Sequence, residues 1–374
     1  MSKVMTFILI LFFNITLFGA GVKNEDRPLK GTWDFSPQKL WEVDGGGGDP
    51  FVRAAQIRVD DDGMVYLLEA KHSKLYVFGP DGKFRFSFGK KGEGPGEYTF
   101  AFTFFIVDKY VIVPSMGRLH YFEKKDGKFV RTEILPAMGM MPRLFLDKDR
   151  FIMIPADPEQ KGGKDTVLMY DVKTKKRETV LEIESEQPMR LSSDSGGRRM
   201  VVMIVDPTTN PGVVMAYKNN KLYFGKSDHY KIRAADLEGK ELFSFSLEGR
   251  ERRKISQAFK KKRVEGFRLN NGRLPPEMAK QMMKSIPDYA TYFSGLMVDD
   301  KGYIYVFIPD PGKQNSQEID IFSPEGTYLY HSEIMFPGGS GISRGPVLKG
   351  DHLYIALEDE AGTLQLVKYK INRI

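Results

Sequence analysis

The sequence contains no cysteine among its 374 residues. This absence excludes a disulfide framework, a thiol nucleophile and a thiolate metal site. It also excludes the lipid-bearing cysteine of a bacterial lipoprotein. A chain without such cross-links must be held together by its core, for which 41% hydrophobic residues provide enough material.

Histidine is scarce as well, with five residues scattered along the chain. Their spacing defines neither a histidine-rich metal site nor a Ser-His-Asp arrangement. The sequence therefore identifies no catalytic residue. The formal net charge of +7 is basic, but it is far from the composition of a protein that coats nucleic acid.

Apolar runs are short, and none reaches the roughly 20 residues that a transmembrane helix needs. At the N-terminus, Lys3 is followed by an apolar stretch over residues 7–18, which is interrupted at Asn14, and then by small residues at 19–21. This order predicts an export signal over residues 1–21. The protein is then periplasmic or secreted, and the mature chain begins directly after the signal. A membrane anchor formed by the same stretch is the alternative.

Aromatic residues are abundant, at 12%, and glycine occurs 37 times. This composition fits many short strands and tight turns better than a helical protein. Residues 57–98 are the clearest example, because Asp62-Gly63 and Asp81-Gly82 provide hairpin turns. Three apolar runs of this segment are too short for helices and read as strands: Met64–Leu68, Leu75–Phe78 and Phe84–Phe88.

The same pattern returns near the C-terminus, in Gly295–His331. Val59–Gly63, VDDDG, matches Val298–Gly302, VDDKG. Phe78–Gly82, FGPDG, matches Phe322–Gly326, FSPEG. Two copies in one chain indicate a repeat architecture.

Units of roughly 40 to 50 residues are typical of propeller blades with four strands. We predict an all-β fold, a six-bladed β-propeller of four-stranded antiparallel blades that occupies residues 22–374 as a single domain. The predicted blades are Ala54–Gly89, Ala101–Leu135, Pro142–Glu184, Val213–Leu247, a fifth from Phe293, and Pro346–Ile371. Blade six shows only three strands, so residues 40–43 are predicted to supply the fourth and close the ring. Ser185–Arg199 is expected to be a polar connection.

Residues 249–292 interrupt the strand pattern and are predicted to form a helical insertion between blades four and five. Arg250–Arg263 contains neither glycine nor proline, and Pro275-Pro276 opens a second run. Ile255 and Phe259 are four residues apart. They form a small apolar stripe that is expected to rest on the propeller.

Two motifs of blade one carry a family resemblance: Phe78–Phe84, FGPDGKF, and Gly89–Tyr98, GKKGEGPGEY. With them the sequence resembles the secreted bacterial six-bladed β-propeller proteins related to NHL-repeat and TolB-like propellers. The resemblance covers most of the mature chain and implies the propeller fold, but it supplies no catalytic residues. Many members of that group are lipoproteins, and this chain differs from them in having no cysteine.

In a propeller, the loops between the second and third strands emerge on the same face as the connections between blades, and ligands usually bind there. We call this the channel face. Its predicted ligand-binding residues are Glu69, His72, Asp157, Asp228, His229, Asp310 and Glu358. Converging carboxylates could hold Ca²⁺, which takes about six to eight oxygen ligands, as in calcium-dependent lactonase propellers. In the alternative interpretation these are solvated loop residues, and no cofactor is needed.

Arg250–Arg263 has eight basic residues and one acidic residue, so its net charge of +7 equals that of the whole chain. Its predicted anion-binding residues are Arg252, Arg253, Lys260, Lys261, Lys262 and Arg263. We expect a basic lid above the acidic loops, or a docking surface for an acidic protein, a glycan or membrane headgroups. A solvated helix face is the alternative. DNA and RNA are poor candidates as partners of an exported protein.

Two function classes remain open. The first is a non-catalytic recognition scaffold, a monomer of the cell envelope that binds a protein, a glycan or another anionic ligand on the channel face. It is favoured because the sequence provides a rigid platform and a charged insertion without an identifiable acid-base or nucleophile set. The alternative is a divalent-metal-dependent hydrolase, lactonase-like, or a lyase with its site at the channel mouth.

Overall fold

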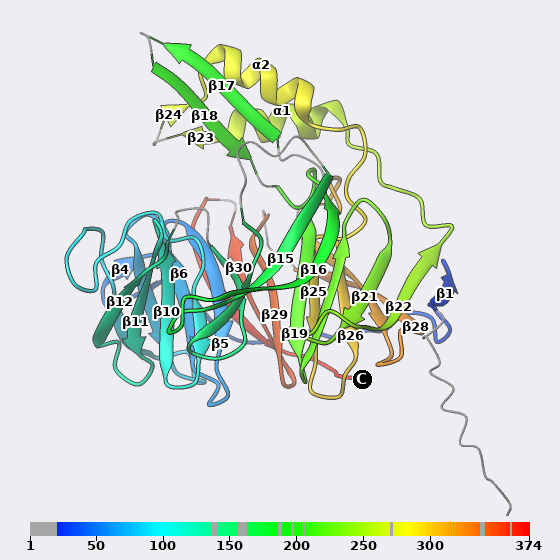
Figure 1. Ribbon diagram of the computed structural model, residues 1–374, viewed down its shortest axis with the longest axis horizontal. Helices are drawn as coiled ribbons and strands as arrows, with labels where there is room; N and C mark the ends of the chain where they lie inside the picture. Colours follow the sequence, from blue (N-terminus) through cyan, green and yellow to red (C-terminus); the bar gives the residue numbers. More distant parts are fainter. Residues whose placement is uncertain are drawn as a thin grey trace, which may run out of the picture.

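Six blades, each built on a four-stranded antiparallel sheet that in one blade gains a fifth strand, are arranged around a central axis, with a separate group of helices and hairpins at one end (Figure 1). The predicted fold class is confirmed. The computed structural model describes residues 21–136, 141–155, 163–185, 189–195, 198–204, 206–269, 272–313, 315–336, 341–359 and 361–374. The predicted export signal lies almost entirely outside the described residues.

In each blade the strands follow one another from the innermost to the outermost position. Blade one consists of β5 (Ala54–Val59), β6 (Val65–Glu69), β7 (Lys74–Phe78) and β8 (Phe84–Phe88). Blade two consists of β9 (Phe105–Val107), β10 (Tyr110–Ser115), β11 (Arg118–Glu123) and β12 (Phe129–Ile134). Blade three consists of β13 (Pro142–Phe145), β14 (Arg150–Met153), β15 (Gly163–Asp171) and β16 (Arg177–Ser185).

The second half of the ring follows the same order. Blade four consists of β19 (Val213–Lys218), β20 (Lys221–Lys226), β21 (Lys231–Ala235) and β22 (Glu241–Glu248). Blade five consists of β25 (Gly295–Val298), β26 (Ile304–Ile308), β27 (Ser316–Phe322) and β28 (Tyr328–Met335). Blade six contains β29 (Gly341–Lys349), β30 (His352–Glu358) and β31 (Leu364–Lys370).

The N-terminal segment completes the ring. Strand β2 (Gln38–Val43) pairs antiparallel with β31 and forms the outermost strand of blade six, which confirms the predicted closure at residues 40–43. Strand β1 (Val22–Glu25), which the sequence did not suggest, pairs in parallel with β22 as a fifth strand of blade four. A short hairpin, β3 (Gly45–Gly46) with β4 (Asp49–Pro50), leads from β2 into blade one. The two ends of the propeller chain are therefore joined through hydrogen bonds rather than a covalent link.

Apolar clusters fill the spaces between neighbouring blades. Between blades four and five, for example, five large side chains are each no more than 1% exposed: Ile232, Phe245, Phe293, Phe322 and Tyr328. Burial of a large apolar side chain stabilises a fold by about 1.5–3 kcal/mol. These clusters hold together a ring that has no cross-links.

Glycines in the two matching turn pairs adopt positive φ, as the turn motifs require. The φ angles are 77° at Gly63, 79° at Gly82, 87° at Gly302 and 91° at Gly326. Two of these glycines also lie against a neighbouring blade. An added Cβ would come within 2.8 Å of Trp41 at Gly82 and within 2.7 Å of Phe245 at Gly326. Both backbone conformation and packing therefore favour glycine at these two positions.

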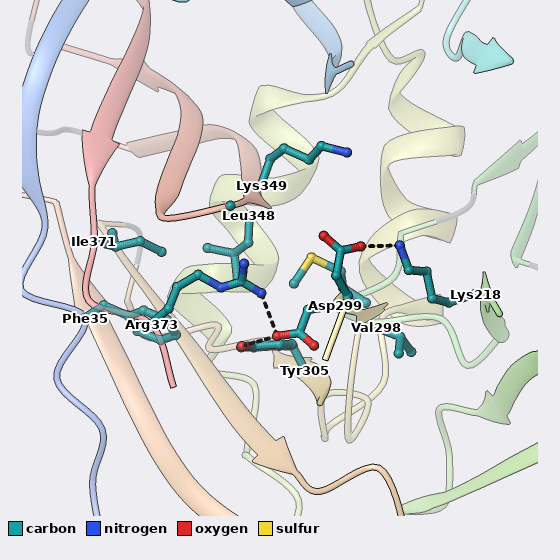
Figure 2. A pocket seen from close by; sticks show the side chains of 12 residues that line it. Phe35, Lys218, Val298, Asp299, Tyr305, Leu348, Lys349, Ile371 and Arg373 are labelled. Carbon is teal, nitrogen blue, oxygen red and sulfur yellow. Dashed lines mark hydrogen bonds and ion pairs between the residues drawn. The ribbon is translucent and has the colours of Figure 1, made fainter. Parts of the chain in front are cut away.

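The turns between first and second strands gather at the end of the ring opposite the channel face. There Asp299 accepts hydrogen bonds from the backbone of its own turn, from the hydroxyl of Tyr305 at 3.1 Å and from Arg373 at 2.7 Å (Figure 2). These residues line a pocket of about 120 Å³. An ion pair from Lys218 to Asp300 joins blades four and five beside it. This end of the ring is thus braced by contacts between neighbouring blades.

The helices and hairpins at the channel face form a unit that we call the cap, residues 189–204 and 250–292. It contains the hairpin of β17 (Met189–Ser195) and β18 (Arg198–Ile204), the helices α1 (Gln257–Gly266) and α2 (Pro276–Ser285), and the hairpin of β23 (Arg268–Leu269) and β24 (Gly272–Arg273). The predicted helices between blades four and five are confirmed. The polar connection expected over Ser185–Arg199 is wrong, because most of it forms the first hairpin.

The cap has a small core of its own. Leu191 from β17 packs there with Ile255, Met278, Met282 and Ile286, each no more than 3% exposed. Phe259 borders this cluster, so the expectation that the stripe of Ile255 and Phe259 rests on the propeller is wrong. A hairpin from a distant part of the sequence supplies the apolar partner instead. Within the described part of the chain, no helix is long and apolar enough to cross a membrane.

Candidate binding face

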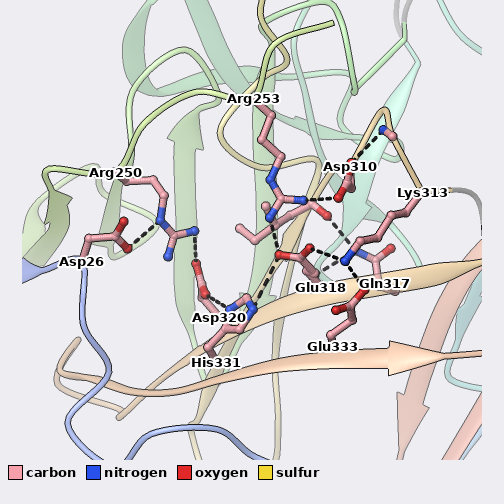
Figure 3. A network of polar contacts seen from close by, with 12 residues as sticks. Asp26, Arg250, Arg253, Asp310, Lys313, Gln317, Glu318, Asp320, His331 and Glu333 are labelled. Carbon is pink, nitrogen blue, oxygen red and sulfur yellow. Dashed lines mark hydrogen bonds and ion pairs between the residues drawn. The ribbon is translucent and has the colours of Figure 1, made fainter. Parts of the chain in front are cut away.

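The cap stands on the channel face because it is inserted into blade-to-blade connections, which emerge there (Figure 1). Arg253 attaches it to blade five. Its guanidinium lies 2.7 Å from Asp310 in the loop between β26 and β27, and it also forms an ion pair with Glu318 at the start of β27 (Figure 3). A second attachment is the pair of Arg263 with the buried Asp206, at 2.8 Å.

Below these pairs lies a buried cluster centred on Asp320, which is 0% exposed. The hydroxyls of Tyr230 and Tyr328 each donate a hydrogen bond to it at 2.7 Å, and the Nδ1–H of His331 donates another at 2.8 Å. Arg250 lies 3.1 Å away and also contacts Asp26 at 2.6 Å (Figure 3).

The cluster explains how a carboxylate can stay ionised inside the ring. Burial alone would raise the pKa of Asp320, but the hydrogen bond from His331, the charge of Arg250 and the two tyrosine hydroxyls together hold this pKa below its ordinary value. Burial and the neighbouring carboxylate raise the pKa of Tyr230 well above its ordinary value. All partners of Asp320 are thus donors. The cluster joins β27, β28 and the residue before β21 to Arg250 at the start of the cap.

Glu69, the acidic residue predicted for the channel face of blade one, has a structural role. Glu69 is 0% exposed, and its carboxylate accepts hydrogen bonds from the backbone N–H groups of Arg53, Lys71 and His72 at 2.8–3.0 Å. His72 Nδ1 lies 2.9 Å from it. The carboxylate is therefore saturated by the loop that it braces, and it does not point into a shared site.

The other predicted acidic residues do not assemble either. Asp228 pairs with Lys226 and with the largely exposed His229, whereas Glu358 is exposed at the end of β30. Asp157 lies outside the described residues. Among the residues that the structure describes, no group of three histidines or carboxylates could hold a metal ion.

The basic run of the cap divides into two sets. Arg252 donates to the backbone carbonyls of Tyr289 and Ala290, and Lys260, which is buried, donates to the carbonyl of Ile286 and to Asp288. These contacts hold the two ends of the insertion together. Lys261 and Lys262 lie on the exposed surface of α1, where Lys261 is 3.9 Å from Glu265 one turn further on.

A cationic feature that the sequence did not single out lies on the innermost strands. Arg58 of β5 donates from Nε to the carbonyl of Phe104, and its guanidinium stacks 4.8 Å from the ring of Phe105 in β9. That ring lies 4.9 Å from Phe145 in β13. Burial lowers the pKa of Arg58 to about 10. The arginine therefore reaches from blade one to blade two, and Phe105 continues the contact to blade three.

Arg143, two residues before Phe145, is a second arginine on an innermost strand. It is exposed to solvent, yet desolvation lowers its pKa, against a weaker opposing effect of Asp165. Both observations fit a side chain that reaches solvent while protein atoms surround part of it. No carboxylate among the described residues forms an ion pair with either guanidinium. Arginines at single positions of two different strands leave no recognisable pattern in the sequence.

Comparison with known proteins supports this description of the fold. Residues 50–197 match the model of a family described as a 6-bladed beta-propeller. The chain has the same fold as a protein of Bacteroides fragilis described as exported, with 16% identity, a TM-score of 0.55, and 94% of this chain and 99% of that chain covered. It is also similar to a protein of Bacteroides vulgatus, with 10% identity, a TM-score of 0.56, and 91% and 99% covered. No curated protein gives a match.

The chain is therefore a six-bladed β-propeller, as the motifs of blade one indicated. Its particular features are the cap on the channel face, the cluster around Asp320 that attaches it, and the two arginines of the innermost strands.

Proposed function

We propose that the protein is an exported, non-catalytic binding propeller that takes an anionic group into the centre of its channel face. The observation that carries this proposal is the pair Arg58 and Arg143. Elsewhere in the described structure arginines such as Arg250, Arg253 and Arg263 pair with carboxylates. The two arginines of the innermost strands form no ion pair with any carboxylate that the structure describes, which leaves their charge for a ligand.

The chemistry of the guanidinium group defines the class of ligand. Arginine binds carboxylate and phosphate groups through two parallel hydrogen bonds, and such pairs gain strength where water is scarce. Desolvation destabilises the protonated, charged form of the Arg58 side chain. A bound anion would stabilise that form and so offset the effect of desolvation. Exposed lysines of the cap, including Lys261 and Lys262, add an attractive field on the same face.

The recognition class is preferred over the metal-dependent hydrolase or lyase because Glu69 braces its own loop and Asp310 pairs with Arg253, so these two carboxylates of the channel face are already engaged. Cleavage of an export signal near residue 21 would leave β1 at the start of the mature chain. Mass spectrometry of the protein from its native host tests export, and an intact Met1 on a soluble protein would contradict it.

Titration calorimetry with inorganic phosphate and with citrate tests the anion site in the purified mature protein. Arg143→Gln is expected to weaken binding about tenfold or more, because a charged hydrogen bond of roughly 1.5–3 kcal/mol is lost. Arg85→Gln is the matched control, since Arg85 lies on the outermost strand of blade one and pairs with Asp81 at the surface. Equal affinities in the two variants would contradict the proposal.

A further inference from the structure

Large apolar side chains are exposed together on the channel face of blade two. Phe100 is 60% exposed, Phe102 58%, Met116 53% and Ile134 69%. Phe100 and Phe102 belong to the connection that enters blade two, Met116 to the loop between β10 and β11, and Ile134 to the end of β12. We call these four residues the apolar patch. Exposed apolar groups gathered in this way mark binding surfaces.

Hydrogen bonds hold the three segments of the patch together. The hydroxyl of Ser115 donates to the carbonyl of Thr99, and the N–H of Leu135 donates to the carbonyl of Gly117 at 2.8 Å. The connection is also fixed from inside by Tyr98, Ala101 and Phe104, each no more than 1% exposed. The outward direction of Phe100 and Phe102 is therefore set by the fold.

Backbone strain coincides with the patch. Phe100 has a φ of 57° and Met116 a φ of 48°. This left-handed region suits glycine, and a bulky residue adopts it only where the surrounding structure enforces it. Met116 and Gly117 form the two-residue turn between β10 and β11, where positive φ is usual. The strain that supports a binding role is therefore that of Phe100, because strain of this kind gathers at ligand-contacting sites.

The patch leads along the chain to Arg58. Phe102 lies two residues before Phe104, a span of no more than about 7 Å, and the carbonyl of Phe104 accepts the hydrogen bond from Arg58. The next residue, Phe105, packs against the same guanidinium. One short segment thus connects an exposed apolar surface with an arginine that has no carboxylate partner among the described residues.

We infer that the ligand is a small amphipathic anion, an apolar chain that ends in a carboxylate. The chain lies on the apolar patch, and the carboxylate reaches Arg58 and Arg143. Charge complementarity selects this occupant, because the apolar surface leads directly to Arg58, a cation that lacks a counter-ion within the described part of the chain. The inference rests on the proposed anion site and adds the tail to it.

Three probes separate head from tail in calorimetry with the mature protein: dodecanoate below its micelle-forming concentration, acetate with the same head, and dodecyl maltoside with the same tail and no charge. Dodecanoate is expected to bind at least roughly tenfold more tightly than either of the others, since burial of its chain adds to the ion pair. Phe102→Ser and Met116→Ser are expected to remove this advantage without changing the affinity for acetate. Met335→Ser, at a residue that is 49% exposed on blade five, is the matched control.

The outcomes distinguish the two proposals, provided that each variant unfolds at the same temperature as the parent. If acetate and dodecanoate bind equally and Arg143→Gln weakens both, the anion site stands and the amphipathic ligand is overturned. If dodecanoate binds the Phe102→Ser and Met116→Ser variants as it binds the parent, the tail does not use the patch. If dodecanoate and dodecyl maltoside bind equally and Arg143→Gln has no effect, both proposals are overturned.

Discussion

Blades one and five are built on the same strand register, and they differ in what they bury. In blade one Tyr76 pairs across the sheet with Ser87, and at the equivalent place in blade five Asp320 pairs with His331. Phe78 and Phe322 occupy matching positions two residues further on. Tyr76 and Asp320 are both 0% exposed.

The difference coincides with the attachment of the cap, which contacts blade five. Tyr76 packs against Phe51 in an apolar cluster, whereas Asp320 needs donors from outside its own sheet. Arg250 comes from the segment that enters the cap, and Tyr230 comes from blade four. A carboxylate can occupy the buried place of an aromatic ring in a repeated blade only where neighbouring elements supply cations or hydrogen-bond donors to it.

Removal of N-terminal strands should lower the unfolding temperature most, and the loss should be larger for the strand beside blade one than for the strand beside blade five. A protein starting at Asp44 lacks both β1 and β2, so blade six and blade one, beside it, lose their closure. Its unfolding temperature should fall by roughly 10 °C or more. A protein starting at Arg27 lacks only β1 beside blade five and should lose less. Thermal unfolding by circular dichroism measures both, and equal stability of the protein starting at Asp44 and the parent would refute the closure.

Asp320→Ala tests the buried cluster of blade five. It leaves Arg250 without its buried counter-ion, so the free energy of unfolding should decrease by about 3–5 kcal/mol. Tyr76→Phe at the equivalent place of blade one removes only a hydroxyl and should change it by less than about 1 kcal/mol. Urea unfolding compares the two. Similar decreases in the free energy of unfolding for the two variants would contradict the proposed difference between the buried carboxylate and the buried aromatic ring.

Gly82→Val and Gly326→Val test the turn that the two blades share. Each variant places a β-branched side chain at positive φ and against a neighbouring blade, so each should destabilise by about 1–3 kcal/mol. The same urea measurements apply. If both variants unfold like the parent, the assigned turn register is wrong in both blades.

Acid should affect blade five more than blade one. The pKa of Asp320 is lowered from 3.8 in the folded protein, so its contribution to stability is fully present above that ordinary value and is lost as the pH falls below it. The parent and Tyr76→Phe should therefore lose more stability between pH 7 and pH 3 than Asp320→Asn does. Parallel pH profiles for all three would contradict this assignment.

Local sequence was enough for much of the ring. The turns at Gly63, Gly82, Gly302 and Gly326 follow from neighbouring residues, because positive φ is a property of a few adjacent positions. Their spacing determined the number of blades, and the unpaired edge of blade six required a strand from elsewhere. The parallel strand β1 was not foreseen, because nothing in so short a segment specifies a partner as distant in the sequence as β22.

The fate of each charged side chain was decided only by the tertiary structure. Glu69 was predicted to belong to an acidic ring, but it braces its own loop. Much of the basic run of the cap forms ion pairs within the protein, with partners such as Asp288 of the cap and Asp310 of blade five. No pattern in the sequence distinguished Arg58 and Arg143 from the other arginines. Strand and turn identities depend on interactions between residues close in sequence, whereas the state of a charge depends on distance and burial, which are set by elements from different blades.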